Sequence, residues 1–220
     1  MGTSPRSMIV LWVLCLFAIG CSSATDRLIA QLSDPDPKVR GAAARALGES
    51  SIDASAAIPA LTDTLDDSDI SVRERAIASL GCRGSAAKSS VPAIVKLLGD
   101  REPPIRLVAA LAIAKIEPRS ESYVPVLTES LLAGHGPMFI EVGRLGADAK
   151  WAVPTLVKLL SDQRANIRAL AAQTLGEIGI GDNHVRRALE QHLRDDQPAV
   201  RKAAQQALQQ IPSQPSAVAH

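Results

Sequence analysis

The side chains best suited to catalysis or metal binding in this chain are four histidines and three cysteines, and their spacing matches no reactive motif. His135, His184 and His192 are each followed by a small or apolar residue and His220 is the last residue, so no histidine is directly followed by a glutamate. The sequence also lacks a Cys/His zinc spacing, a glycine-rich phosphate loop and a serine elbow. We therefore predict no catalytic, cofactor-binding or metal-binding residue and no cofactor.

Cysteine usage leaves one thiol to explain. Cys15 and Cys21 belong to an apolar N-terminal segment, so Cys82 has no partner for an intramolecular disulfide. Cys82 could be a nucleophile or a small residue in a turn. No histidine or acidic residue forms a recognisable motif around it, which favours the turn residue.

Charged residues recur in a fixed pattern that suggests a structural use of arginine. An Asp is followed six residues later by an Arg that comes directly after Val or Ile, in five blocks: Asp34 to Arg40, Asp67 to Arg73, Asp100 to Arg106, Asp162 to Arg168 and Asp195 to Arg201. Such an Arg can satisfy turn carbonyls and a carboxylate across a repeat boundary. A row of arginines could also bind a polyanion, but each has its matching Asp. With 24 Lys and Arg against 23 Asp and Glu, the chain shows no nucleic-acid footprint.

The spacing of these blocks predicts an all-α chain of about six two-helix repeats. The arginines step by 33, 33, 62 and 33 residues, so one repeat without the Arg lies between Arg106 and Arg168. Prolines of the same period (Pro59, Pro92, Pro125, Pro154) are expected to open the first helix of their repeats. Apolar residues at helical spacing after each Val or Ile predict the second helix, and glycines (Gly48, Gly81, Gly176) are expected to end it in a left-handed cap. Aromatic residues are only 2% of the chain, so Ala, Leu, Val and Ile must build the core.

Two segments carry a resemblance to a known family. The segments DPDPKVRGAAARALG (34–48) and GADAKWAVPTL (146–156) resemble HEAT-like repeats of the phycobilisome-lyase type, over residues 25–211. The resemblance implies a right-handed superhelical solenoid, in which the Asp and Arg residues form a ladder between neighbouring repeats. We number the expected repeats one to six: 25–52, 53–85, 86–118, 119–148, 149–181 and 182–211.

Family members with phycobilin lyase activity exist, and deoxyhypusine hydroxylase binds two irons through His-Glu pairs, which this chain lacks. We therefore expect a scaffold that binds protein partners without catalysis, and a monomer. A lyase-like protein that handles a cofactor or chromophore, or a family-level oxidoreductase, is the alternative.

Repeat four departs from the pattern. Its Arg position holds Phe139, its Asp position holds Ala133, and the turn 134–137 reads Gly-His-Gly-Pro. The aromatic residues that follow the N-terminal segment all lie in or beside this repeat: Tyr123, Phe139 and Trp151. They could fill space where a shortened repeat packs badly, or, with His135, form an exposed partner-binding site.

The N-terminus predicts a lipid anchor. Arg6 precedes an apolar run from Ile9 to Ile19, too short to span a bilayer, and the run ends at Gly20-Cys21. This end resembles the bacterial lipobox, so residues 1–21 are expected to be a signal segment with Cys21 lipidated, in the cell envelope. An ordinary secretory signal is the alternative. Ser22 after the Cys favours the outer over the inner membrane in a Gram-negative cell. Residues 22–211 would form the solenoid and 212–220 a disordered tail.

Overall fold

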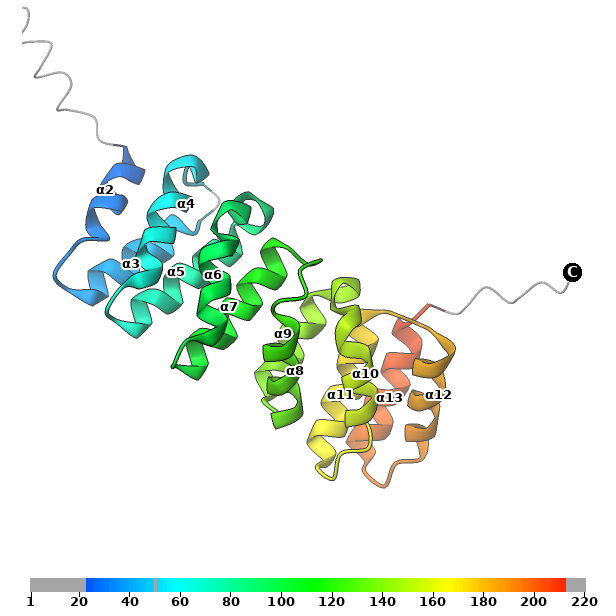
Figure 1. Cartoon of the computed structure of the whole chain (residues 1–220). Coiled ribbons are helices and arrows are strands. Elements are labelled where there is room, and N and C mark those ends of the chain that lie inside the picture. Colours follow the sequence, from blue (N-terminus) through cyan, green and yellow to red (C-terminus); the bar gives the residue numbers. More distant parts are fainter. Residues whose placement is uncertain (1–22, 50, 213–220) are drawn as a thin grey trace, which may run out of the picture. The chain divides into compact units, whose positions relative to one another are not determined.

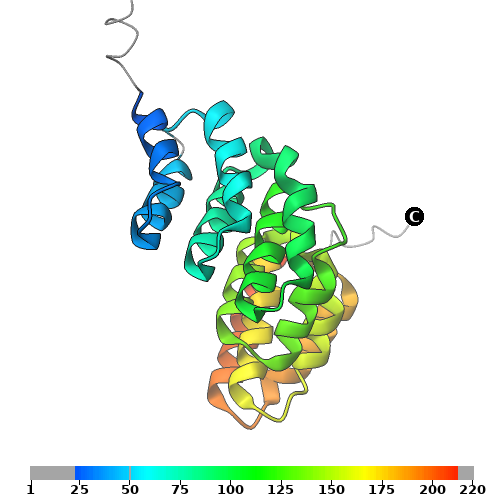
Figure 2. The same ribbon diagram turned by 60° about the vertical axis from the view of Figure 1, so that its left-hand side comes forward.

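The computed structural model describes residues 23–49 and 51–212. These residues form pairs of helices joined by short turns, without strands, which confirms the predicted all-α architecture (Figures 1 and 2). The expected signal segment 1–21 with Cys21, and the expected tail beyond Pro212, lie outside the described residues. No helix within the described ranges has the length and apolar character to cross a membrane. The chain divides into two compact parts, one ending at Arg83 and one beginning at Gly84.

The N-terminal part contains repeats one and two. Its helices are: α2 (Ala24–Gln31), α3 (Pro37–Leu47), α4 (Ala54–Asp63), continued by the 3₁₀ turn η1 (Thr64–Asp66), and α5 (Ile70–Cys82). The second helices of the two repeats, α3 and α5, pack against each other, while α2 packs on α3 and α4 packs on α5. Their core is aliphatic, with Leu47, Leu61, Ile77 and Leu80 fully buried.

The C-terminal part contains repeats three to six in the same order. Its elements are: η2 (Gly84–Ser90), α6 (Val91–Lys96), η3 (Leu97–Gly99), α7 (Pro103–Ile116), α8 (Val124–Ala133), α9 (Gly136–Arg144), η4 (Gly146–Ala152), α10 (Val153–Leu159), α11 (Ala165–Ile178), α12 (Asn183–Gln191), η5 (His192–Arg194) and α13 (Pro198–Gln210). Among the second helices, α9 packs on α11 and α11 packs on α13. The first helices α6, α10 and α12 pack on the second helices of their own repeats.

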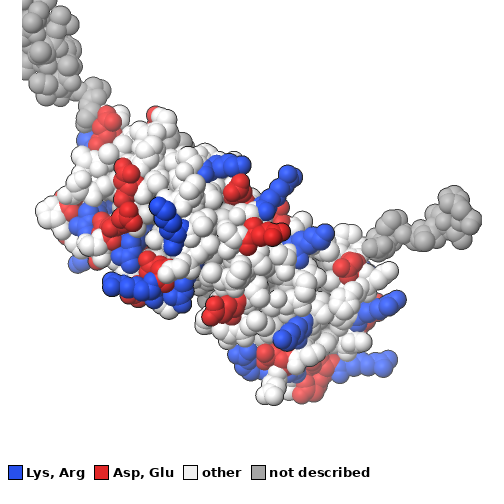
Figure 3. Space-filling view, in the orientation of Figure 1, with Lys and Arg blue, Asp and Glu red and all other residues white. Residues whose placement is uncertain are grey.

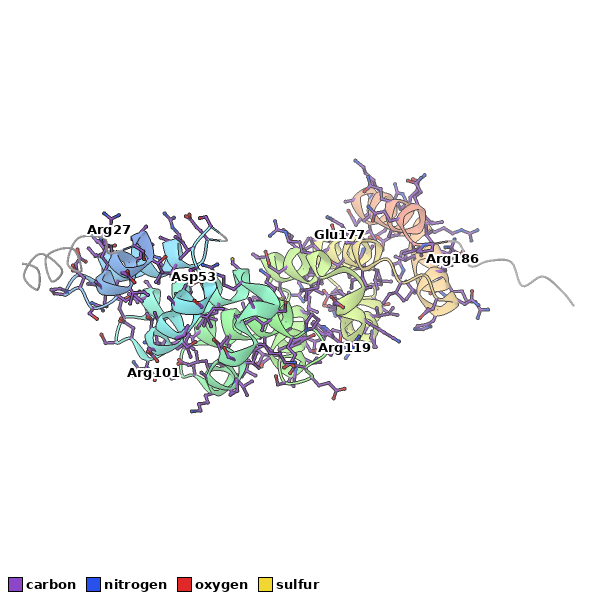
Figure 4. All side chains as sticks on the ribbon, turned by 90° about the horizontal axis from the view of Figure 1, so that it is seen from above. Arg27, Asp53, Arg101, Arg119, Glu177 and Arg186 are labelled. Carbon is purple, nitrogen blue, oxygen red and sulfur yellow. The ribbon has the colours of Figure 1, made fainter. Side chains whose placement is uncertain are left out.

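The expected role of proline is confirmed in three of four repeats. Pro92, Pro125 and Pro154 lie in the first turn of α6, α8 and α10, where the missing N–H costs nothing. Pro59 instead lies inside α4. This helix begins earlier because Asp53 (labelled in Figure 4) caps it, its carboxylate accepting a hydrogen bond from the Ser55 amide at 2.9 Å.

The expectation that Gly48, Gly81 and Gly176 end helices in a left-handed cap is wrong. Gly48 has φ −73°, and Gly81 and Gly176 lie inside α5 and α11. Two of these glycines instead allow the second helices to approach closely. A Cβ on Gly48 would come within 3.0 Å of the Ser79 backbone, and one on Gly176 within 2.7 Å of the Ala207 backbone. Small residues are therefore needed where α3 meets α5 and where α11 meets α13.

The five repeated Asp-Arg blocks share one local geometry. In each block the Arg Nη1 donates to the backbone carbonyl of the Asp six residues earlier, at 2.8–3.0 Å. The carboxylate of that Asp accepts a hydrogen bond from the amide two residues after it, which fixes the turn before the second helix. The Arg therefore closes the turn of its own repeat.

The carboxylate that meets the Arg fork comes from the following repeat, 27 residues on. Arg40 Nε and Nη2 donate to the two carboxylate oxygens of Asp67 at 2.7 and 2.8 Å. Arg168 holds Asp195 in the same way, at 2.9 and 2.8 Å. We call such an arrangement a complete rung. Arg73 and Asp100 belong to different parts of the chain, so their pairing stays a prediction.

The aromatic side chains of repeat four are mostly core residues. Phe139 is fully buried, and the Thr174 hydroxyl of α11 donates to its backbone carbonyl at 3.3 Å. Tyr123 is buried as well, and its hydroxyl donates to the Pro118 carbonyl at 2.7 Å. The hypothesis of an exposed aromatic site is therefore wrong for Phe139 and Tyr123. The reason is that α9 packs on α11, so position 139 faces the interior of the helix pair.

The rung between repeats one and two predicts a stability effect. Asp67→Asn should lower the free energy of unfolding by about 1–3 kcal/mol at neutral pH, because the Arg40 fork loses its charged partner. Urea unfolding followed by circular dichroism measures the change. Asp66→Asn, which changes a neighbouring exposed carboxylate, is the matched control and should unfold like the wild type. Equal unfolding of all three proteins would show that the rung does not stabilise the fold.

The same pair predicts how this difference varies with pH. The hydrogen bonds from Arg40 hold the pKa of Asp67 below its ordinary value of 3.8 in the folded chain. A carboxyl whose pKa is lower in the folded state stabilises the fold above its unfolded pKa and loses that contribution as the pH falls through its folded pKa. The gap between wild type and Asp67→Asn should therefore be full above about pH 5 and shrink below about pH 4. A gap independent of pH would contradict an ionic rung.

The burial of Phe139 predicts a large cavity penalty. Phe139→Ala should cost about 3–5 kcal/mol of unfolding free energy, because a fully buried ring is removed. Ile140→Ala on the same helix is the control, since Ile140 is 48% exposed and its loss should matter little. Thermal unfolding followed by circular dichroism compares the variants. A Phe139→Ala protein as stable as the Ile140→Ala protein would mean that position 139 is not core.

Candidate functional site

The C-terminal part contains an apolar groove of about 740 Å³ lined by α7, α8 and α9. Leu107 and Leu111 of α7, one helical turn apart, form one wall, and Val126 of α8 and Met138 of α9 face them. The two leucines and Val126 remain half-buried. The groove therefore exposes a continuous apolar surface that the fold itself leaves uncovered.

The groove exists because the second helices of repeats three and four do not pack closely. Among the described helices α9 packs on α11 and α11 on α13, but α7 packs on α6 and α8 and barely touches α9. One side-chain bridge crosses the gap, from Lys115 Nζ on α7 to Glu141 Oε2 on α9 at 3.3 Å. The shortened repeat four thus leaves a gap on the side of α7, whereas α3 and α5, α9 and α11, and α11 and α13 form helix interfaces.

Charged residues mark the two ends of the groove. At the turn end, Arg106 lines the wall directly after the Asp-rich turn, in which Arg101 is labelled in Figure 4. Toward the other end, Glu141 forms ion pairs with Lys115 at 3.3 Å and with Arg144 at 2.5 Å. Glu129 stands exposed on the α8 wall. Elsewhere, acidic and basic side chains are interspersed on the face shown in Figure 3.

Arg106 keeps only half of a rung. Its Nη1 donates to the Asp100 carbonyl at 2.8 Å and to the Arg101 carbonyl at 3.3 Å, as ladder arginines do in their own repeats. The position 27 residues later, where a carboxylate completes the rungs of Arg40 and Arg168, is Ala133. No carboxylate of the described chain pairs with Arg106, and both residues line the groove.

On the other side of repeat four a different arginine completes the connection. Arg164 Nη1 donates to the Ala133 carbonyl at 3.3 Å, the bond that an Arg at position 139 would make. Its Nε and Nη2 hold the Asp162 carboxylate at 2.9 and 3.0 Å. These hydrogen bonds lower the pKa of Asp162 to about 2. Arg164 therefore links repeats four and five, although position 139 holds Phe instead of Arg. The rung without a carboxylate, that of Arg106, lies at the boundary with repeat three.

His135 is the one sequence-predicted partner-binding residue that lines the groove. Its Nδ1 lies 3.0 Å from the Ser130 hydroxyl, across the turn that ends α8. A catalytic serine–histidine pair would need an exposed serine and a carboxylate on the other ring nitrogen. Ser130 is buried, and within the described ranges no such carboxylate contacts His135. This contact is therefore a helix-end hydrogen bond.

Trp151 lies outside the groove. Its ring meets the Tyr123 ring edge-on, with centroids 5.9 Å apart, and is half-buried. Burial raises the pKa of the Tyr123 hydroxyl, as expected for a core side chain. Of the four candidate partner-binding residues, the structure therefore brings only His135 to an accessible apolar surface.

The groove residues themselves were not recognised as a site from the sequence. Arg106 was assigned only a ladder role, and Leu107, Leu111 and Met138 read as ordinary helix positions. The spacing of 27 residues between a ladder Arg and its carboxylate partner identifies the site, because it places Ala133 where Arg106 would need a carboxylate.

The remaining reactive side chains do not gather with the groove. Cys82 is the last residue of α5 and is exposed, which is not the turn position expected for it. His184 is exposed on α12, and His192 Nδ1 lies 2.8 Å from the Ala188 carbonyl. No group of three or more His, Cys, Asp or Glu residues suited to a metal ion occurs in the part of the chain that the structure describes.

Three solved structures illustrate the likeness of fold. An engineered protein is 23% identical, with 86% of this chain and 96% of that chain covered and a TM-score of 0.56. The complex of CpcE and CpcF of phycocyanin lyase from Nostoc sp. is 21% identical, covering 84% and 76%, with a TM-score of 0.55. A computationally designed armadillo repeat protein for modular peptide recognition is 20% identical, covering 84% and 99%, with a TM-score of 0.51. At these identities the likeness shows the fold alone.

No curated protein shows significant similarity to the sequence. The family model for HEAT repeats, however, matches residues 6–81, 58–142 and 140–209. Together these matches cover the described helices from α2 to α13. The chain therefore belongs to the HEAT repeat family.

Proposed function

We propose that this protein is a non-catalytic binding scaffold, held at the cell envelope by a lipid on Cys21, whose groove between α7, α8 and α9 takes a segment of a protein partner. The observation that carries the proposal is the uncovered apolar groove. Its volume of about 740 Å³ suits side chains of a peptide segment. A concave pocket lined mostly by apolar side chains with a few polar groups is the usual form of a binding site.

The chemistry of the groove supports binding over catalysis. Three of its polar side chains have contacts within the fold: Arg106 closes a turn through Nη1, Glu141 holds Lys115 and Arg144, and His135 contacts Ser130. Activation of a nucleophile needs a base and a group that orients it, and the groove wall offers no such set. The lyase-like alternative has its support in the likeness of fold to a phycocyanin lyase complex alone.

The anchor is supported by the N-terminal sequence and by the start of the first helix. The apolar run ends at Gly20-Cys21, and Ser23 already caps α2 through a reciprocal pair of hydrogen bonds with Asp26. Two residues of chain therefore separate Cys21 from a folded helix. A lipid on Cys21 would hold repeat one within about 10 Å of the bilayer surface.

Site-directed crosslinking tests the groove. A photo-crosslinking amino acid at Glu129, exposed on the groove wall, should give discrete protein adducts in intact cells. The same amino acid at Glu190, exposed on α12 outside the groove, is the matched control and should give none of these adducts. Identical adducts from both positions, or none from position 129, would count against the groove. A chromophore adduct would favour the lyase-like alternative.

Fatty-acid labelling tests the anchor. Cys21→Ala should abolish incorporation of an alkyne-bearing fatty acid and release the protein from the membrane fraction or leave it unprocessed, because the acceptor thiol is gone. Cys82→Ala removes the exposed thiol on α5 and should label and fractionate like the wild type. Labelling that survives Cys21→Ala would show that the lipid site is elsewhere.

A further inference from the structure

We infer that the segment bound in the groove carries an Asp or Glu side chain beside apolar residues, and that its carboxylate completes the open rung of Arg106. This inference rests on the proposed function and specifies the chemistry of the partner. The carboxylate would occupy the place that Asp67 and Asp195 take on their arginines, and the apolar side chains would cover Leu107 and Leu111.

The geometry of the complete rungs defines what Arg106 offers. In Arg168, Nη1 is held by the Asp162 carbonyl at 3.0 Å, and the edge formed by Nε and Nη2 faces the Asp195 carboxylate. Arg106 Nη1 is held by the equivalent carbonyl, that of Asp100, at 2.8 Å. In a complete rung the Nε–Nη2 edge meets the carboxylate 27 residues later, and for Arg106 that position is Ala133, which supplies only a methyl group.

A carboxylate is the group that fits this edge best. A guanidinium presents parallel N–H donors that match the two oxygens of a carboxylate, and such charge-assisted pairs are stronger than neutral hydrogen bonds. The fork is also held in place before binding, so little conformational freedom is lost when a ligand arrives. A lysine-rich partner would meet the like charge of Arg106 at this end of the groove.

The other charges in the groove set the direction of the segment. Lys115 and Arg144 are both paired with Glu141, so the cations at that end already have a carboxylate partner, which Arg106 lacks. Glu129 lies on the α8 wall and disfavours a second carboxylate in the middle of the groove. A single acidic side chain near the turn 134–137, followed by apolar residues along α7, is the arrangement that meets all of these groups.

An internal acidic side chain, rather than a chain terminus, is the source we assign. The missing group is the side chain of an Asp inside a turn, and in complete rungs that Asp also accepts a hydrogen bond from the amide two residues later. A segment that turns in this way can present its carboxylate and still continue along the apolar wall.

Peptide binding tests the inference. The full-length chain in lipid nanodiscs would be titrated with fluorescent nine-residue peptide pools that are acetylated and amidated at their ends. The pools have Leu, Val and Ala at random around a central Asp, Asn or Lys, and empty nanodiscs serve as the blank. Fluorescence anisotropy should show the Asp pool binding about tenfold or more tightly than the Asn pool. Equal binding of the Asp and Asn pools, or tighter binding of the Lys pool, would overturn the inference.

Three variants locate the effect. Ala133→Asp places a carboxylate of the chain itself on Arg106, so it should retain folding and lose the preference for the Asp pool. Arg106→Ala should also lose the preference. Arg201→Ala is the matched control, because Arg201 makes the same turn contacts, at 2.8 and 3.0 Å, has no carboxylate partner among the described residues, and lies outside the groove. It should keep the preference.

The outcomes separate the inference from the proposed function. The three pools could bind with equal affinity, and Leu111→Glu could block all of them. The groove would then bind apolar segments without recognising the carboxylate. If the preference for the Asp pool survives Ala133→Asp and Arg106→Ala, another part of the protein recognises the carboxylate and the inference fails. If neither peptides nor crosslinked partners occupy the groove, the proposed function fails with it.

Discussion

The arginine that closes its own turn and, in the complete rungs, also holds a carboxylate of the next repeat is the interaction on which the rest of this structure depends. One guanidinium satisfies the carbonyl of its own turn through Nη1 and a carboxylate 27 residues later through Nε and Nη2. The core between repeats consists of aliphatic side chains and close helix contacts, such as Gly48 against Ser79. Such small side chains offer few specific contacts, so the rung fixes the register of neighbouring helix pairs.

The interruption in repeat four shows how this constraint can be relaxed on one side. Loss of both the Arg and the Asp would leave repeat four untied at two boundaries. Arg164 restores the boundary with repeat five, by meeting the Ala133 carbonyl and the Asp162 carboxylate together. The boundary with repeat three has no such replacement in the described chain, and α7 and α9 stay apart. The groove and the missing carboxylate partner of Arg106 therefore both follow from the altered sequence of repeat four.

The buried aromatic residues belong to the same change. Where the other repeats place a half-buried arginine at the edge of the second helix, repeat four places Phe139 in the core between α9 and α11. A large ring gives α9 a firm contact on the side of repeat five. Tyr123, directly before α8 of repeat four, packs against Trp151, which precedes α10 of repeat five. The shortened repeat thus packs toward its C-terminal neighbour, and its opposite face lines the groove.

Much of the fold could be read from the sequence, because repeats encode neighbours at a constant distance along the chain. The period of 33 residues predicted the helix pairs, and Pro92, Pro125 and Pro154 open helices as expected. The sequence-based prediction was wrong where a residue's role depends on its neighbours in space. Gly176 permits close helix packing instead of ending a helix, and Pro59 lies within a helix that Asp53 starts earlier.

For the candidate site, too, some features follow from the sequence and others only from the tertiary structure. The sequence by itself determined that Ala133 and Phe139 break the ladder, that His135 lies in the altered turn, and that no catalytic motif accompanies them. Only the tertiary structure decided that Arg40 and Arg168 pair with a carboxylate of the following repeat, that Arg164 takes over one boundary, and that Phe139 and Tyr123 face inward. The physical reason is that sequence periodicity fixes which residues are neighbours, whereas the direction of a side chain follows from how a shortened repeat packs on the helices around it.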